Sequence, residues 1–356
     1  MIMKRILLLL TGFSLLLLSC TSPFNNDVPT PPEKTTYKNP VVAGSLPDPT
    51  VIRGKDGNFY VYATEDTYNV PIMASSNLAS WHYVARAFTD ATRPRFEPTG
   101  NVWAPDINYI DGKYVMYYAM STWGGIQTCG IGVAVADAPG GPFTDLGKMF
   151  RSNEIGVTNS IDPSYFEYDG KKYLVWGSFH GIYAVQLKDD GLSVVDDAEA
   201  TKIKLAGTAF EAPYIHKHGD YYYLFASWGS CCNGAKSTYR VVVGRSKDIW
   251  GPYVNKEGEG MLSNNFSVVI SPNDTFVGNG HNAGIIQDDA GQDWILYHGI
   301  EIGKENDGRF LLLDQLKWDE NGWPYIEGGS PSTTCLLYTS DAASTSEQPL
   351  PVFNKK

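Results

Sequence analysis

Short runs of aromatic and aliphatic residues recur along this chain, each preceded by a turn and by a polar residue beside proline. The first unit has Pro47-Asp48-Pro49, the turn Asp56-Gly57 and the apolar run 59–63. Four similar units follow, with apolar runs at 114–118, 173–176, 221–225 and 294–297. Apolar runs of this length, bounded by Gly and Asp turns, predict short antiparallel strands.

The repeat length indicates how these strands assemble. The polar anchors of the five units are spaced by 58, 56, 49 and 70 residues, and they are Asp48, Asp106, Asp162, Glu211 and His281. This period suits a blade of four antiparallel strands, whereas a helical solenoid would need longer apolar-periodic segments. We therefore predict an all-β fold, a five-bladed β-propeller over residues 37–329.

A propeller would bring the anchors together, because the innermost strand of every blade starts beside the central axis. Asp48, Asp162 and Glu211 would then form a cluster of carboxylates around one polar hole, with His281 beside them. The alternative is that Asp-Pro and Asp-Gly pairs only mark turns. That interpretation is preferred for Asp56 and its equivalents, but not for the anchors.

Composition narrows the class of ligand. The 356 residues carry a formal charge of −11, which argues against nucleic acid and disfavours a polyanionic substrate. Aromatic residues make up 13%, with 22 Tyr and 9 Trp. Such side chains commonly stack on sugar rings. We expect one domain and a monomer.

The N-terminal segment is typical of an exported bacterial lipoprotein. Lys4-Arg5 precedes an apolar run at 6–18 that is too short for a membrane span. We interpret residues 1–19 as a lipoprotein signal peptide, Cys20 as the lipid attachment site and 20–36 as a flexible linker. The expected location is the outer membrane, facing the periplasm or the cell surface, and the membrane contact is the lipid anchor alone. An ordinary secretory signal is the alternative.

The chain end and the remaining cysteines are less informative. Residues 330–356 are rich in Ser, Thr, Pro and Ala and are predicted to be a disordered tail. Part of this tail resembles a translated sequencing adapter, so an artefactual origin stays open. Export permits disulfides. Cys231 and Cys232 are adjacent and are left open as linked, free or engaged with Cys129.

Three acids in one pocket suit glycoside hydrolysis, in which one carboxyl protonates the leaving oxygen and another acts on water or on the sugar. At the level of motifs the chain resembles glycoside hydrolase family 43, and within it the arabinan endo-1,5-α-L-arabinosidases. The resemblance covers residues 37–327. Its motifs are Leu46-Pro-Asp-Pro-Thr50, Val102-Trp-Ala-Pro-Asp106, Asn159-Ser-Ile-Asp-Pro163, Phe210-Glu-Ala-Pro-Tyr214 and Cys231-Cys-Asn-Gly-Ala-Lys-Ser-Thr-Tyr-Arg240.

The resemblance implies a five-bladed propeller and a role for each acid. Asp48 matches the general base, Glu211 the general acid and Asp162 the carboxylate that tunes and orients the acid. The family inverts configuration, so Asp48 and Glu211 are expected to lie roughly 6.5 to 9.5 Å apart, with room for a water molecule.

The resemblance also places a set of residues at the sugar-binding surface, and it places His281 beside a calcium ion in the central channel. Trp103 is alternatively a blade-packing residue, and His281 alternatively only bonds a carboxylate. Calcium prefers oxygen, so water would have to complete its shell. The expected substrate-binding residues are Trp103, Asp106, Gly124, Asn159, Ser178, Phe179 and His180.

The predicted function is hydrolysis of internal α-1,5-L-arabinofuranosyl bonds of arabinan with inversion. One alternative is another activity of the same family: exo-acting arabinan hydrolysis, α-L-arabinofuranosidase or β-xylosidase. A second is a non-catalytic surface lipoprotein that binds glycans. Intact Asp48, Asp162 and Glu211 favour the enzyme.

Overall fold

The computed structural model describes residues 33–65 and 69–339, and the side chains of 33–35 and 335–339 lie outside the description. These residues fall in one compact unit that begins at Pro32. The predicted signal peptide, the lipid attachment site Cys20 and most of the predicted linker and tail lie outside the described residues. Within the described part of the chain, no helix is both long and apolar enough to span a bilayer.

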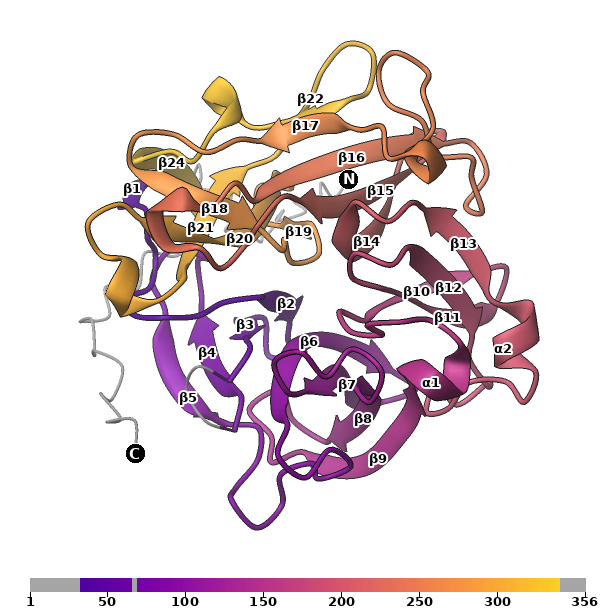
Figure 1. Ribbon diagram of the computed structural model, residues 1–356. Helices are drawn as coiled ribbons and strands as arrows, with labels where there is room; N and C mark the ends of the chain where they lie inside the picture. The colour runs from indigo at the N-terminus through magenta and orange to yellow at the C-terminus, as the bar shows by residue number, and fades with distance from the viewer. Residues whose placement is uncertain (1–32, 66–68, 340–356) are drawn as a thin grey trace, which may run out of the picture. The chain divides into compact units, whose positions relative to one another are not determined.

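Five four-stranded antiparallel sheets surround a common centre (Figure 1), which confirms the predicted all-β five-bladed propeller. Within each of the first four sheets, consecutive strands are neighbours. The blades are β2–β5 (Thr50–Arg53, Phe59–Tyr62, Pro71–Ser75, His82–Arg86), β6–β9 (Asn101–Ile110, Lys113–Ser121, Gly130–Ala136, Thr144–Arg151), β10–β13 (Ser164–Tyr168, Lys171–Trp176, Ile182–Gln186, Ile203–Ala206), β14–β17 (Phe210–His218, Tyr221–Trp228, Arg240–Ser246, Ser267–Ile270) and β18–β21 (Phe276–Gly280, Ile286–Gln287, Asp293–Glu301, Phe310–Gln315).

Short helices and one small sheet lie between these strands or after them. The small sheet pairs β22 with β23. The bounds are α1 Ser152–Ile155, α2 Ala198–Thr201, η1 Gly234–Lys236, η2 Met261–Ser263, η3 Glu305–Asp307, η4 Glu327–Gly329, β22 Lys317–Trp318 and β23 Pro324–Tyr325.

Apolar side chains fill the interfaces between neighbouring blades, because the second strand of each blade is buried on both faces. β3 and β20 contribute Phe59, Val61, Trp294 and Leu296 to one such cluster. Four further clusters join the remaining neighbouring blades in the same manner. Truncating a fully buried aromatic residue such as Trp176 typically costs about 3–5 kcal/mol of unfolding free energy. The aromatic surplus is therefore partly explained by the core.

The fifth blade is completed by a segment from the start of the chain. β18 and β19 both pair with β20, and β21 pairs with the other edge of β20. The outer edge of β21 receives backbone hydrogen bonds from Val41 to Leu311 and from Leu46 to Arg309. This contact closes the ring between the first blade and the last.

A two-stranded antiparallel sheet joins the two ends of the described chain. β1 (Glu33–Lys38) pairs with β24 (Thr334–Thr339). The paired segments overlap the predicted linker and the predicted tail, so regular pairing occurs in both. The division of the chain at these points stays a prediction.

The same unusual backbone conformation occurs at one position in all five blades. The residue before each inner-strand proline, or before Asn282 in the fifth blade, has a positive φ between 42° and 60°. This left-handed conformation is unfavourable for residues other than glycine, which identifies the position as a shared structural feature. The five residues are Asp48, Ala104, Asp162, Ala212 and His281.

Candidate active site

Asp48 and Asp162 occupy equivalent positions in their blades, while Glu211 lies one residue earlier and Asp106 two residues later than that position. All three predicted catalytic acids are almost completely buried, with 6–9% of their surface exposed. They line a single cavity of about 550 Å³. The structure therefore brings the three acids together from blades far apart in sequence.

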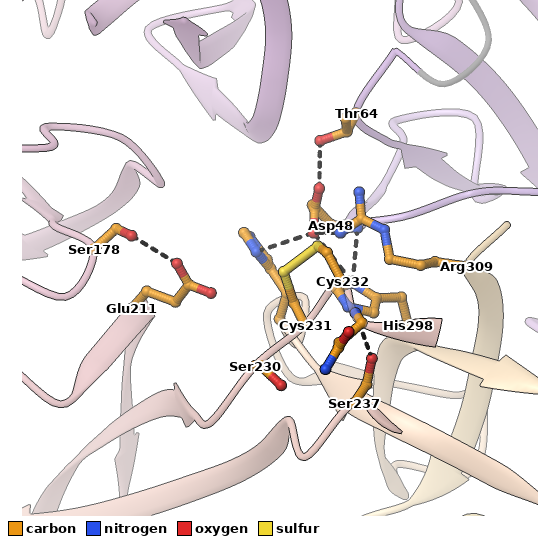
Figure 2. Close-up of a disulfide and its surroundings, with 12 residues drawn as sticks. Asp48, Thr64, Ser178, Glu211, Ser230, Cys231, Cys232, Ser237, His298 and Arg309 are labelled. Atoms are coloured by element: carbon orange, nitrogen blue, oxygen red, sulfur yellow. Dashed lines mark hydrogen bonds and ion pairs between the residues drawn. A yellow bond between two sulfur atoms is a disulfide. The ribbon is translucent and has the colours of Figure 1, made fainter. Parts of the chain in front are cut away.

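Asp48 is held by side chains that flank two strands, with Thr64 after β3 and Arg309 immediately before β21. Thr64 donates its hydroxyl to Asp48 Oδ2 at 2.6 Å, and Arg309 Nη1 donates to Oδ1 at 2.7 Å. The backbone N–H of Asp48 donates to His298 Nδ1 at 3.1 Å. His281 Nδ1 lies 3.4 Å from Oδ1. The carboxylate is thus fixed on both oxygens (Figure 2).

These partners keep Asp48 ionised. Burial raises its pKa, but Arg309, His281 and His298 outweigh burial and hold the pKa well below its ordinary value. Burial lowers the pKa of His281 to about 4, so its imidazole is neutral near pH 7. Arg309, by contrast, is a charged partner of Asp48 at that pH.

Glu211 and Asp162 have the opposite electrostatic environment. Burial raises the pKa of Glu211 and outweighs the hydrogen bonds from Ser178 and Tyr239 that lower it. Burial, with Glu211 and Asp48 nearby, raises the pKa of Asp162. Ser178 donates to Glu211 Oε2 at 2.6 Å, and Asp162 Oδ2 accepts the Ala212 N–H at 3.2 Å. One carboxyl that favours ionisation thus shares a cavity with two that favour protonation.

Most of the predicted sugar-binding residues line this cavity, namely Trp103, Gly124, Asn159, Ser178 and Phe179. Asn159 Nδ2 donates to Ser178 Oγ at 2.9 Å, so the two residues form a chain that ends on Glu211. Trp103 also packs on the small apolar cluster of Ala119, Cys129 and Ile161, which gives it a packing contact as well as a cavity face.

Asp106 and His180 lie elsewhere. Asp106 Oδ2 accepts the backbone N–H of Tyr165 at 2.8 Å and the amide of Asn108 at 2.7 Å, which connects the second blade to the third. Burial raises the Asp106 pKa to about 7. His180 is exposed beside Phe179 but does not contribute to the cavity lining. Substrate contacts by these two residues stay predictions.

A second, much smaller cavity of about 20 Å³ is lined by inner-strand residues of all five blades, including Asp106, Asp162, His281 and Asn282. Buried Asn282 Oδ1 has no hydrogen-bond partner among the described residues. A cavity of this volume has room for one water molecule or one ion. Across residues 33–65 and 69–339, no three His, Cys, Asp or Glu side chains form a metal-binding group.

These donors fit calcium only with water molecules completing most of its shell, since Asn282 supplies an oxygen and His281 a single nitrogen. Calcium beside His281 therefore stays a prediction, and no chemical step below depends on it. When bound, the ion would add positive charge near the carboxylates.

Sequence reasoning assigned no role to several residues that complete the site. They are Thr64, which follows β3, His298 within β20, Arg309 immediately before β21, and Tyr239, which lies inside the motif at 231–240. Tyr239 is buried, bonds Glu211, and stacks on His298 with ring centroids 5.7 Å apart. Nothing in the 231–240 motif indicated the contact between Tyr239 and Glu211, and Arg309 is distant from every motif.

The open question about the cysteines is answered for the described side chains. Cys231 and Cys232 form a disulfide, and Cys129 is buried and free. Both disulfide residues line the large cavity with Asp48 and Glu211.

Comparison with known proteins agrees with this geometry. The family described as "Glycosyl hydrolases family 43" matches residues 37–324. An extracellular exo-α-(1→5)-L-arabinofuranosidase of Cellvibrio japonicus is 36% identical, covering 79% of this chain and 86% of the relative. An extracellular endo-α-(1→5)-L-arabinanase of Bacillus subtilis is 32% identical, covering 78% and 87%.

Among solved structures, the Cellvibrio cellulosa α-L-arabinanase complexed with arabinohexaose has a TM-score of 0.71 at 33% identity, covering 79% of this chain and 95% of that one. Its fold and the sequence relatives point to the same family as the carboxylate cluster. The chain belongs to glycoside hydrolase family 43.

Proposed function

We propose that this protein hydrolyses internal α-1,5-L-arabinofuranosyl bonds of arabinan with inversion of configuration. The observation that carries the proposal is the opposite displacement of two pKa values within one cavity, lowered for Asp48 and raised for Glu211. General acid–base hydrolysis needs this pairing, because the base must be ionised while the acid holds a proton.

In the proposed reaction the two carboxyl groups act at the same time. Glu211 donates its proton to the glycosidic oxygen as the bond from that oxygen to the anomeric carbon breaks. A water molecule bonds to the anomeric carbon from the opposite face and passes a proton to Asp48. Proton exchange with solvent then returns Asp48 to its ionised form and Glu211 to its protonated form.

The neighbouring residues have positioning roles in this scheme. Arg309 and Thr64 hold the Asp48 carboxylate, and the chain from Asn159 through Ser178 orients Glu211. Asp162 is assigned to orienting the acid, because its Oδ2 accepts the backbone N–H of Ala212, the residue after Glu211, while the negative charge of Asp48 helps Glu211 to retain its proton.

Arabinan as substrate is supported by the names of the relatives and by the arabinohexaose bound to a similar structure. Exo action is the second candidate, because one of the relatives is an exo-acting arabinofuranosidase at 36% identity. The early products from linear arabinan decide between them. Mixed oligosaccharides support endo action, and one small product from the start supports exo action.

One variant, measured beside the wild-type protein, tests whether the protein is an enzyme at all. We expect Glu211→Gln to abolish nearly all hydrolysis while arabinan still binds, since the amide keeps the shape but has no acidic proton. A variant with the full wild-type rate, or a wild-type protein that binds arabinan without cleaving it, would support the glycan-binding alternative instead.

We also propose export to the cell envelope with a lipid on Cys20. Both cited sequence relatives are described as extracellular, which is consistent with export. Cys20→Ala should shift the protein from the membrane fraction to the soluble fraction. Unchanged partitioning would leave an ordinary secretory signal as the explanation of residues 1–19.

A further inference from the structure

The Cys231–Cys232 disulfide lies in the loop between β15 and β16, which reaches from Trp228 to Arg240. In the view of Figure 2 it appears between Glu211 on one side and the Asp48–Arg309 pair on the other, and both cysteines line the same cavity as these residues. Cys232 is exposed and Cys231 half-buried. The disulfide therefore faces the space that substrate would enter.

Holding the loop together does not require this bond. Ser230 accepts backbone hydrogen bonds from Thr238 and Tyr239 at 3.1 Å, which closes the neck of the loop. Inside it, Ser237 Oγ accepts the Asn233 N–H at 2.9 Å. A bond between adjacent residues closes almost no chain, so it removes little conformational entropy from the unfolded state. A role in chain stabilisation is accordingly small.

The bond does change the surface that the loop presents. Two thiols are weak hydrogen-bonding groups that rotate independently, whereas a disulfide between neighbours is one rigid, polarisable and largely apolar unit. Other parts of the cavity lining are apolar too, with Trp103, Trp123 and Ile161 contributed by the second and third blades. The three acids and several hydroxyl groups line the same cavity.

A furanose ring has hydroxyl groups at its edge and C–H groups on its faces, so it needs both kinds of lining. We propose that the Cys231–Cys232 disulfide is an apolar contact surface for a sugar ring next to the cleavage point, and that it raises substrate affinity without taking part in proton transfer. This inference rests on the proposed arabinan hydrolysis, and its test reads binding separately from turnover.

Two double variants separate the effect of an apolar surface at positions 231 and 232 from the effect of the disulfide bond itself. Cys231→Val/Cys232→Val keeps apolar side chains of similar size, and Cys231→Ser/Cys232→Ser replaces them with hydroxyl groups; neither forms a disulfide. Affinity for linear arabinohexaose is measured by calorimetry in a Glu211→Gln background, and KM and kcat are measured in the wild-type background.

We expect the Ser pair to weaken binding and raise KM about tenfold, equivalent to about 1.4 kcal/mol, with kcat within about twofold of wild type. The Val pair should stay within about threefold in both quantities. Dithiothreitol, which becomes oxidised as the S–S bond becomes two thiols, should raise the wild-type KM and leave the Ser pair unchanged, although Cys129 is still present.

Equal behaviour of the Val and Ser pairs would overturn the inference, whether both keep wild-type affinity or both lose it together with thermal stability. If instead the wild-type protein binds arabinohexaose but does not cleave it, the proposed function fails, and the Val and Ser pairs still decide whether the disulfide contacts the sugar.

Discussion

Replacing Thr64 with valine removes the hydroxyl group that donates to the proposed base, Asp48, while the side-chain volume stays almost constant. Thr64 is 5% exposed. Its hydroxyl donates to Asp48 Oδ2 at 2.6 Å and accepts the backbone N–H of Ala104 at 2.8 Å. The residue therefore links the base in the first blade to the left-handed position of the second blade.

Thr64→Val removes two hydrogen bonds, one to the Asp48 carboxylate and one from the backbone N–H of Ala104. A hydrogen bond to a charged group contributes about 1.5–3 kcal/mol, and leaving a buried N–H unsatisfied costs about 1–3 kcal/mol. Because Asp48 lines the large cavity, we expect water to replace part of the hydrogen bond that its carboxylate loses. We expect Thr64→Val to lower the free energy of unfolding by about 2–4 kcal/mol and kcat/KM by about 10- to 100-fold.

The pH dependence of kcat/KM distinguishes a change in the Asp48 pKa from a simple loss of stability. The Thr64 bond favours the ionised form of Asp48, so its removal raises the Asp48 pKa and moves the acidic limb of the kcat/KM profile to higher pH. Thr64→Ser keeps the hydroxyl and should restore the wild-type limb. A Thr64→Val enzyme that is folded by circular dichroism and has wild-type kcat/KM and acidic limb would refute the assignment of Asp48 as base.

Two further predictions concern the central channel. The pKa of Asp106 is raised from 3.8 to about 7, so the folded state binds this proton more tightly than the unfolded chain does. The resulting stabilisation of the folded state is about 4 kcal/mol at most. It is fully present below about pH 4 and is lost as the pH rises through 7. In protein freed of metal by chelation, Asp106→Asn should therefore gain thermal stability relative to wild type as pH is raised from 5 to 8, and a gap independent of pH would contradict this. Exhaustive chelation should lower both Tm and activity, with calcium and not magnesium restoring them; unchanged values would remove the calcium prediction.

The fold was predictable because its signal is repeated. Each blade has an aromatic strand after a Gly turn, so five weak indications of a strand add up to one architecture. The closure of the ring was not predictable in the same way. Residues 41–46 complete the last blade through backbone hydrogen bonds to β21, and such bonds leave no mark on side-chain composition.

The residues of the candidate site were likewise predictable where they belong to a repeat and were not predictable elsewhere. Asp48, Asp162 and Glu211 lie within proline-containing repeats, and the structure places all three in one cavity. Arg309 is the counterexample, since it contacts Asp48 from 261 positions along the chain, just before β21, and has no repeat around it. Asp106 belongs to a repeat but is displaced by two residues from the left-handed position, so its side chain bonds Tyr165 and does not line the large cavity.

The configuration of the first product tests the central claim most directly. Proton NMR of linear arabinan during the first minutes of hydrolysis reports the anomer released before mutarotation. Water activated by Asp48 opposite Glu211 predicts the β-anomer from an α-linked substrate. Initial release of the α-anomer would mean retention, with one carboxylate attacking carbon directly, and would contradict the proposed roles of both acids.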